Sequence, residues 1–554
     1  MKGSTISVIF NGKLPISNDV NSILTWCPKL NVIIKSMNKT SIWCYRLDGE
    51  RLYSINNKAI IKNITFHENY FCLSGADSSV KVYDANDGAL MTIIDHCFND
   101  IQFLNWNSTE FVLEDAVLQG LPAIYHLSYK LEYLVINDAN SLTINYNKLL
   151  NVSKATTFHF QQQLKSGLFH QVYLDKDANL VSVDLNVSSP KLYTDSIIIM
   201  CHIMEYFGKT KIVVEELQNE IKPLLTSIDR YLSNLSEETG GNLIATLSEI
   251  LITNLIPEST KDFWLNQFGE RGFKRLSKQL ETVDEKVTKK IFRYLVSPME
   301  RVIVLINKLI GICKWNDVLG IDVSELFTFM NSCETQIKAY YKVIWDFKSQ
   351  KEKFSELLSW WKTIIDILEE KEWSISYSTS KLLEYIQSDM TKPELLKHFS
   401  YDLDILGFNK CNTLENQQDA LLSQFETIIS QVNAHHSLLI KIEFLQKLNL
   451  PNHKDLQLTE WDGQTIITYL TETTLVISTP TSILATVPNV IAYQQRSNDL
   501  IALTQKHLLI IDSSSSIPIS LPHLDFEPRL IRLNSSYVCL SDAMKSKYVV
   551  LQIE

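Results

Sequence analysis

The stretch that decides the fold is Tyr70–Leu90, which reads YFCLSGADSSVKVYDANDGAL. An apolar run comes first, and Ala76–Ser79 supplies a polar turn. A second run ends in Tyr83-Asp84, before another turn at Asp87-Gly88. Apolar residues alternate with small or polar ones in both runs, which is typical of half-buried strands. The stretch therefore predicts two antiparallel strands joined by a tight turn.

The same two-strand pattern occurs seven times, four times before a long helical block and three times after it. The copies are Val32–Ser36 with Ser41–Arg46, Tyr70–Gly75 with Ser79–Asp84, Tyr133–Asn137 with Ser141–Tyr146, Gln171–Asp175 with Asn179–Asp184, Thr465–Leu470 with Thr474–Thr479, Asp499–Thr504 with His507–Asp512, and Tyr537–Asp542 with Tyr548–Ile553. A period of roughly 40 residues is the length of one four-stranded propeller blade. The sequence predicts a seven-bladed WD-like β-propeller interrupted by a long inserted α-helical bundle.

Three details qualify this prediction. Asp84 follows Tyr83 where a typical WD repeat carries Trp-Asp, so the repeats are degenerate and the ring is inferred from repetition. The longer gap between the second and third copies is assigned to loops or an irregular strand around Asn107–Leu121. An open last blade would leave an unpaired strand edge, so Ile6–Phe10 is expected to pair with the strand that ends at Ile553.

After Pro190 the apolar residues recur every three or four positions, as one face of a helix requires. Several long antiparallel helices of this kind pack into a bundle. The expected domains are residues 1–189 with blades one to four, 190–455 with the bundle, and 456–554 with blades five to seven. The expected helices cover residues 197–232, with Pro223 inside, then 287–309, 326–347, 353–370, 381–388, 393–399 and 417–448.

Composition narrows the class of protein. A formal charge of −11 argues against a nucleic-acid grip, which requires a concentrated basic face. The nine cysteines are odd in number and form no CxxC pair, which favours reduced thiols in a cytosolic or nuclear protein. No apolar run has the length of a signal-peptide core or a membrane span, so we expect a soluble intracellular protein without membrane contact.

The sequence lacks the motifs of the common catalytic sites. It has no P-loop, no GxSxG elbow and no HExxH. His435 and His436 are adjacent, so on a helix they point about 100° apart and are poorly placed to share a metal. We therefore predict a protein that is not an enzyme, with no catalytic, cofactor-binding or metal-binding residues.

Aromatic residues of the bundle are the candidates for contacts with partner proteins. Trp361 fits the apolar stripe of its helix, which leaves Trp360 for a neighbouring helix, the propeller or a partner. Aromatic anchors are enriched at binding hot spots, and Phe263 and Trp264 are the other candidates. Packing within the chain is the alternative interpretation of Trp360, and the sequence favours it.

Several segments resemble one family, subunit 4 of the anaphase-promoting complex, or cyclosome. The resemblance covers most of the first 370 residues in order and spacing, and after Thr465 it rests on layout alone. The segments are Leu24–Pro28, Ile42–Leu47, Phe263–Leu265, Gly269–Leu276, Pro298–Val302 and Phe354–Trp361.

This resemblance implies a non-catalytic scaffold of a large cullin–RING-type ubiquitin ligase, which supports ubiquitination of cell-cycle regulators in mitosis. It implies a hetero-oligomer, with subunits 1 and 5 as the chief partners and with the cullin and tetratricopeptide subunits nearby. The implied location is the nucleus and cytoplasm.

Two other classes of function stay open. A peptide-binding propeller would act as a substrate adaptor or as a vesicle-coat or trafficking scaffold, and it predicts basic or aromatic residues gathered at the loops of one face. An enzyme built from scattered carboxylates is the third class, and no motif favours it.

Overall fold

A computed structural model of the chain describes residues 6–17, 22–27, 29–94, 98–112, 122–125, 127–128, 130–407, 413–448, 454–461, 464–479, 482–496, 499–512, 515–534 and 537–553. The chain divides into two compact units. Unit 1 contains residues 1–112, 130–197 and 433–554, and unit 2 contains residues 113–129 and 198–432.

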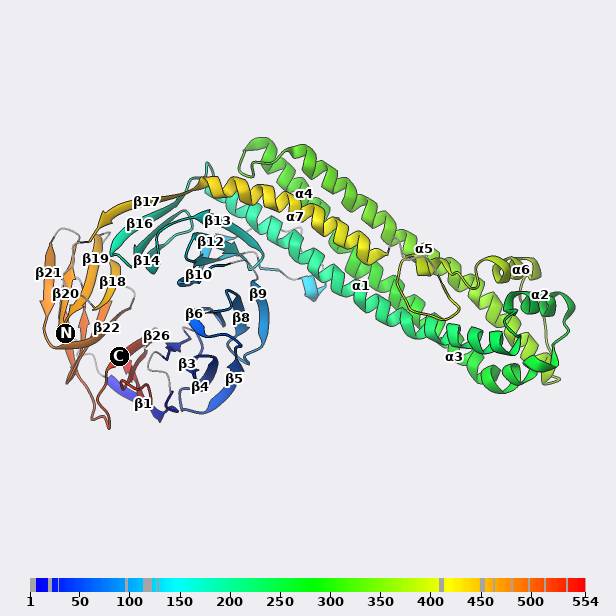
Figure 1. Ribbon diagram of the computed structural model, residues 1–554, viewed down its shortest axis with the longest axis horizontal. Helices are drawn as coiled ribbons and strands as arrows, with labels where there is room; N and C mark the ends of the chain where they lie inside the picture. The colour runs from blue at the N-terminus through cyan, green and yellow to red at the C-terminus, as the bar shows by residue number, and fades with distance from the viewer. Residues whose placement is uncertain are drawn as a thin grey trace. The chain divides into compact units, whose positions relative to one another are not determined.

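Unit 1 is a ring of four-stranded antiparallel sheets, seven of them among the described residues (Figure 1). Three blades are continuous in sequence before the helical block. They are formed by β2 (Leu24–Trp26), β3 (Val32–Met37), β4 (Ser41–Arg46) and β5 (Arg51–Asn56); by β6 (Ile61–His67), β7 (Tyr70–Gly75), β8 (Val80–Asp84) and β9 (Leu90–Ile94); and by β10 (Phe103–Val112), β11 (Lys130–Asn137), β12 (Ser141–Tyr146) and β13 (Leu150–Ala155).

Two further continuous blades, the fifth and sixth, follow the helical block. They contain β18 (Lys454–Trp461), β19 (Gln464–Thr471), β20 (Thr474–Ser478) and β21 (Ile483–Val487), and then β22 (Val490–Arg496), β23 (Asp499–Thr504), β24 (His507–Ile511) and β25 (Ser516–Ser520). The seven sequence copies are thus the second and third strands of the seven blades, and the predicted fold class is confirmed.

Blade four is the blade that carries the insertion. Its first three strands are β14 (Phe160–Ser166), β15 (His170–Asp175) and β16 (Asn179–Leu185), and its fourth is β17 (Ile440–Lys447). β17 pairs antiparallel with β16 from Leu185↔Ile440 to Asn179↔Lys447. The prediction of a helix up to residue 448 is therefore wrong for residues 440–447. The expected domain limits at 189 and 455 stay a prediction, although β17 joins the insertion to blade four.

Blade seven closes the ring with the first strand of the chain. It contains β26 (Leu530–Asn534), β27 (Tyr537–Ser541) and β28 (Lys547–Ile553), and β28 pairs with β1 (Ile6–Lys13) from Ile6↔Ile553 to Lys13↔Lys547. The expected closure by the N-terminal strand is confirmed. Because the last blade takes a strand from the start of the chain, its β28 edge is paired rather than open.

The second strands of the blades are nearly fully buried, since blades pack on both of their faces. Apolar clusters fill the spaces between neighbouring blades. At blades one and two, Ile34, Cys44, Phe71 and Leu73 share one such cluster. Turns between strands use residues with positive φ. Asn147 and Lys148 are the two central residues of a β-turn that the Leu149 amide closes by donating to the Tyr146 carbonyl at 2.9 Å, as in a type I′ turn.

The long gap before blade three is partly explained. β10 extends to Val112, and its pairing with β11 shifts in register between Ser108 and Val112. Residues 113–121 of the predicted irregular segment lie outside the described residues. Beyond them, Tyr125 donates a hydrogen bond to the carbonyl of Tyr294 at 2.5 Å, and His202 Nε2 lies 2.8 Å from the carbonyl of Ser128. Both contacts lie within unit 2, so Tyr125 and Ser128 pack with its helices.

Unit 2 is built from long helices. They are α1 (Pro190–Glu238, whose first residues belong to unit 1), α2 (Leu243–Thr253), η3 (Glu258–Thr260), η4 (Phe263–Phe268), α3 (Gly269–Lys290), η5 (Ile291–Val296), α4 (Ser297–Trp315), α5 (Val323–Leu368), α6 (Thr379–Ser388), η6 (Glu394–Lys397) and α7 (Leu414–Leu439), with the short η2 (Ala123–Tyr125). α1 ends before Gly240 and Gly241, which both have positive φ, as a helix C-terminus favours.

Two predicted helix boundaries are wrong. The separate helices expected over 326–347 and 353–370 are one helix, α5. The residues between them, Lys348–Glu352, are good helix formers that contain no Gly or Pro, so nothing local interrupts the backbone hydrogen bonds. The helix expected over 287–309 is the continuous run of α3, η5 and α4, in which η5 is a π-helical segment.

Candidate interaction surfaces

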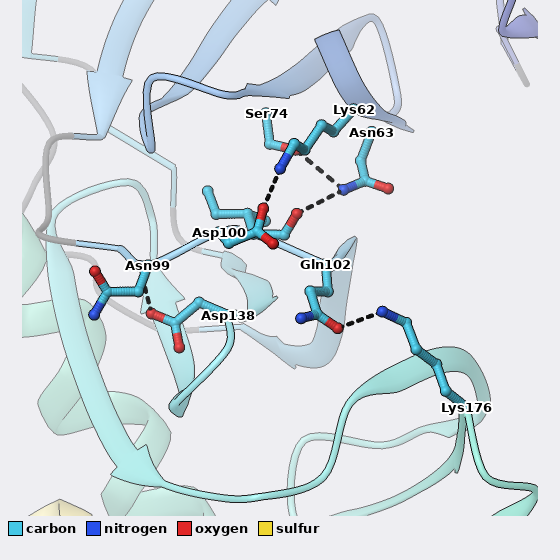
Figure 2. A network of polar contacts seen from close by, with 9 residues as sticks. Lys62, Asn63, Ser74, Asn99, Asp100, Gln102, Asp138 and Lys176 are labelled. Carbon is cyan, nitrogen blue, oxygen red and sulfur yellow. Dashed lines mark hydrogen bonds and ion pairs between the residues drawn. The ribbon is translucent and has the colours of Figure 1, made fainter. Parts of the chain in front are cut away.

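One end of the ring carries the turns between second and third strands together with the loops between blades, and we call it the loop face. At blades two and three, Lys62 forms an ion pair with Asp100, whose φ is +55° (Figure 2). Asn63 donates hydrogen bonds to Ser74 Oγ at 3.2 Å and to the Ile101 carbonyl at 3.4 Å. These contacts connect the inner strand of blade two to the loop that enters blade three.

The network continues from blade three to blade four. Gln102 Oε1 accepts a hydrogen bond from Lys176 Nζ at 2.6 Å, and Asp138 Oδ2 accepts one from the Asn99 amide at 3.0 Å (Figure 2). The other oxygen of Asp138 accepts from the amides of Asn140 and Ser141 and so fixes the turn. Side chains that bridge three blades and define their turns hold the loop face in one shape, as a binding platform needs.

The ring is hollowed in two places, one on the loop face at blades five to seven and one between the inner strands of blades four to seven. A hollow of about 470 Å³ is lined by Glu472, Asn489, Gln505, Lys506 and Arg529, among others. A second, of about 560 Å³, is lined by residues of the inner strands, including Gln162, Gln457, Gln494, Gln495 and Arg532. Amide and cationic groups of this kind can hydrogen-bond a peptide backbone or a carboxylate. Neither lining contains a cysteine or histidine.

The closure seam between blades seven and one contains a buried cation. Lys35 is fully buried and donates hydrogen bonds to the carbonyls of Pro15 at 2.6 Å and Lys545 at 2.5 Å. Burial lowers the pKa of Lys35 to about 8, and the nearby Asp542 carboxylate opposes that shift. Asn534 also donates to the Cys27 carbonyl at 3.0 Å. The two ends of the chain are therefore held together by side chains as well as by strand pairing.

The titratable groups that the structure describes have the properties of structural residues. Burial raises the pKa of Cys44 to about 11 and that of Cys539 to about 12, so both thiols stay protonated at neutral pH. His67 stacks on Trp106 with ring centroids 5.2 Å apart, and burial lowers its pKa. His96 lies outside the described residues. No group of three His, Cys, Asp or Glu side chains in the described part is placed to hold a metal ion.

The adjacent residues His435 and His436 both lie on α7 but differ in burial. His435 is half-buried and His436 is fully buried. The ring of His436 lies 4.7 Å from that of Tyr193, within unit 1. His436 is buried because it packs on Tyr193. The spacing of residues along a helix does not predict this contact.

The three predicted interface residues lie in the interior of unit 2. Trp360, Phe263 and Trp264 are all buried. Phe263 and Trp264 contact each other edge-on at 4.9 Å, and the ring of Trp264 lies 5.7 Å from that of Trp361. Phe268 also packs on Trp361, at 5.1 Å. Side chains that pack on one another in this way are not exposed to a partner, so their burial agrees with the alternative of packing within the chain.

Sequence reasoning missed the aromatic residues that are exposed. Phe292, Trp315, Tyr341 and Trp345 all have more than a third of their surface accessible, and Trp345 is 74% exposed. The sequence holds a signal for Tyr341 and Trp345. The apolar stripe of α5 contains Tyr340, and a residue one position further along a helix points about 100° away. A position off the stripe is not sufficient for exposure, however, because Trp360 is also off it and is buried.

No helix in the described part of the chain is both long enough and apolar enough to cross a bilayer. The structure as described is a closed WD-type ring with a helical insertion in its fourth blade. Its candidate interaction surfaces are the loop face of the ring and the exposed aromatic residues of the helices. These features define the class as an interrupted propeller.

Family models identify the chain more closely. The model described as "Anaphase-promoting complex subunit 4 WD40 domain" matches residues 24–109, and the model "Anaphase-promoting complex, cyclosome, subunit 4" matches residues 179–371. Together they cover about half of the chain, one in the ring and one across the start of the insertion. The chain belongs to the subunit 4 family of the anaphase-promoting complex.

Other comparisons add little. No curated protein sequence matches the chain. Among solved structures, the computationally designed Ika8 protein is similar at 15% identity with a TM-score of 0.22, over 29% of this chain and 44% of that one. Dihydro-heme d1 dehydrogenase NirN is similar at 8% identity with a TM-score of 0.22, over 30% and 35%. The chain thus spans less than half the length of either, and TM-scores this low define neither fold nor function.

Proposed function

We propose that this chain is a non-catalytic scaffold subunit of the anaphase-promoting complex, a cullin–RING-type ubiquitin ligase. It acts by joining other subunits, so that the ligase can ubiquitinate cell-cycle regulators in mitosis. The observation that carries the proposal is the closed ring, whose fourth blade is interrupted by 254 residues between Leu185 and Ile440 that form mainly long helices. One chain thereby supplies two different rigid elements for contact with other subunits.

The proposed partners are subunits 1 and 5, with the cullin and tetratricopeptide subunits of the same complex as further neighbours. The loop face supports this role because Asp138 and the contacts across blades two to four fix its turns. Permanent partners in such assemblies bury several thousand Å² in total, which requires broad and pre-formed surfaces. The proposed location is the nucleus and cytoplasm, where the complex acts.

A second candidate is a peptide-binding propeller that serves as a substrate adaptor or a vesicle-coat scaffold. The hollow of about 470 Å³ on the loop face, with Lys506 and Arg529 in its lining, favours it. It predicts that short peptides bind at this hollow and that large subunits do not bind permanently.

Affinity purification of the tagged full chain from dividing cells, followed by mass spectrometry, separates the two candidates. The scaffold predicts stoichiometric recovery of the cullin and tetratricopeptide subunits, and cross-links to subunits 1 and 5. Recovery of vesicle-coat proteins, or of substrates alone, would contradict it. A Lys506→Glu/Arg529→Glu variant separates them further. It should abolish peptide binding at the hollow, whereas a scaffold held by a broad interface should lose little from two charges and stay assembled.

A further inference from the structure

Three aromatic side chains of unit 2 are exposed on neighbouring helices. Phe292 of η5 is 42% exposed, Tyr341 of α5 is 45% exposed, and Trp345 of α5 is 74% exposed. Tyr341 and Trp345 are four residues apart and therefore lie on one face of α5. Phe292 contacts Tyr341 edge-on, with ring centroids 5.7 Å apart. The three residues therefore form one continuous aromatic surface.

Two contacts fix how the helices run past each other. Lys351 of α5 pairs with Asp284 of α3 at 2.5 Å, and Tyr341 of α5 contacts Phe292 of η5. From Tyr341 to Lys351 the residue number rises along α5, while the contacted residues of the other run fall from Phe292 to Asp284. The α3–η5 run therefore lies antiparallel to α5. Lys289 is accordingly level with Trp345. The line along which the two runs pack together is therefore bordered by one row of side chains from α3 and η5 and one row from α5.

Cationic residues surround these aromatic residues. There are six of them, all exposed, and none forms an ion pair with another residue that the structure describes, whereas the neighbouring Lys290 and Lys351 do. Between Lys338 and Lys348 of α5 the single carboxylate is Asp346, which is buried and lies 2.7 Å from His398. The six cations are Lys286, Lys289, Arg293, Lys338, Lys342 and Lys348.

We call Phe292, Tyr341, Trp345 and these six cations the basic–aromatic face. Its charge is opposite to that of the whole chain, which is −11. Arg293 lies over the ring of Tyr294, 5.9 Å from its centroid, but no ion pair with a described residue neutralises any of the six charges. Like charges that are close together repel one another and are stabilised by an anionic partner. Exposed aromatic residues at the centre of a charged rim have the composition of a protein-binding hot spot.

We propose that the basic–aromatic face binds an acidic amphipathic helix of a partner protein. Along α5 the face extends from Lys338 to Lys348, about 15 Å at 1.5 Å per residue, which is close to three turns of a bound helix. An apolar stripe of that helix would cover Trp345 and the seam beside it, and its carboxylates would meet the two rows of cations.

A helix fits this surface better than a nucleic acid does. Exposed carboxylates lie at the margins of the face, namely Glu285, Glu334 and Glu352. A phosphate backbone that crossed the face would meet these charges, and single-strand binding uses a basic groove that follows the backbone over several nucleotides. A short helix ends before it reaches them. This inference concerns a surface of the chain itself and does not depend on the scaffold proposal.

The test uses the full chain and fluorescence anisotropy with labelled synthetic peptides of about 14 residues, near the lower length limit for a helix in water. Such a helix is about 21 Å long, shorter than the roughly 27 Å along α5 from Glu334 to Glu352. The probe has Leu at i, i+3, i+4 and i+7 and Glu at the exposed positions. A scrambled peptide of the same composition and a labelled oligothymidylate are the competitors. We expect the amphipathic peptide to bind more tightly than either, with an affinity that falls as salt increases.

Variants locate the binding site. Trp345→Ala is expected to weaken binding about tenfold, as the loss of a hot-spot aromatic does, and Lys338→Glu/Lys342→Glu at least as much. Trp315→Ala removes another exposed tryptophan of unit 2, at 85% exposure, and is expected to change nothing. Lys222→Glu/Lys381→Glu makes the same change of charge at exposed lysines elsewhere, and it is expected to weaken binding less than twofold.

Four results would overturn the proposal. One is that the amphipathic peptide does not bind. Another is that it binds the Trp345→Ala and Lys338→Glu/Lys342→Glu chains as tightly as the parent. The third is that the scrambled peptide binds equally well, because binding would then depend on the net charge of the peptide and not on an apolar helix face. The fourth is tighter binding of the oligothymidylate, which would assign the face to nucleic acid.

Discussion

Lys35 shows how a single residue can couple the closure of the ring to pH. Its ammonium group is fully buried between blades one and seven, where it donates to the carbonyls of Pro15 and Lys545. Burial disfavours the charged form, and this lowers the pKa of Lys35 to about 8. In the unfolded chain a lysine titrates near pH 10.4.

Stability at this seam should therefore rise with pH. Between pH 8 and about 10.4 the unfolded chain binds the proton and the folded chain does not, so the free energy of unfolding increases with pH. For Lys35→Met this dependence is lost. The difference in unfolding free energy between parent and variant should rise by up to about 3 kcal/mol over that range, measured by urea denaturation.

Lys58→Met, at an exposed lysine, is the matched control and should give a difference that is constant with pH. A constant difference for Lys35→Met as well would show that the buried amine is protonated throughout this range.

Trp361 is the second residue on which stability depends strongly. It is fully buried and packs against Phe263, Trp264 and Phe268. Trp361→Ala would leave a large cavity and should lower the free energy of unfolding of the helical unit by about 3 to 5 kcal/mol. Chemical denaturation followed by helical circular dichroism measures this.

Trp315→Ala, at an exposed site, should change that free energy by less than about 0.5 kcal/mol. Equal effects of the two substitutions would contradict the buried aromatic cluster.

At the scale of elements, β1 is the strand that completes the ring. It pairs with β28 along its length and removes an open edge from the last blade. Deletion of residues 1–12 should lower the melting temperature of the propeller by roughly 5 to 10 °C, because the backbone hydrogen bonds of β28 lose their partner. Differential scanning calorimetry of the full chain measures it.

Deletion of residues 1–4, which precede β1, is the control for this experiment. It should leave the transition unchanged. If both deletions melt like the parent, the pairing of β1 contributes nothing to closure.

Elements also show where local patterns fail. Residues 440–447 follow α7 with no Gly or Pro between, yet they form β17. Ile440, Ile442 and Phe444 alternate with charged residues, as in a strand, and the free edge of β16 offers backbone partners to an extended chain. The expected break between 347 and 353 is absent for the opposite reason, since α5 contains no residue that interrupts a helix. Tertiary pairing decided the first case and local propensity the second.

At the scale of the whole molecule, the ring should fold without its insertion. Unit 1 includes residues up to 197 and from 433 onward, and it contains complete hydrogen-bonded blades. A chain in which a short Gly–Ser linker replaces residues 198–432 should keep a strand-type circular dichroism spectrum. It should melt within about 5 °C of the propeller transition of the full chain.

The same replacement in the chain that also lacks residues 1–12 should melt lower, as the deletion does in the full chain. An aggregated or unfolded product from the simple replacement would mean that the ring requires the helices.

The surface of the molecule was harder to predict than its interior. The sequence placed Trp361 on the apolar stripe of its helix, and the structure buries it. The sequence did not separate the buried Trp360 from the exposed Trp345, because both are tryptophans on the same long helix. Exposure depends on which neighbouring helices cover each face, and that is a property of the packing.

The amino-acid sequence by itself determined seven repeats and a helical block between the fourth and fifth. Both follow from the period of the apolar residues, which backbone geometry sets locally. Only the tertiary structure decided that β17 completes blade four and that a basic–aromatic face is exposed. The β16–β17 pairing joins residues about 250 positions apart. Hydrogen bonds and packing at that separation form only when the chain closes, and no local pattern encodes them.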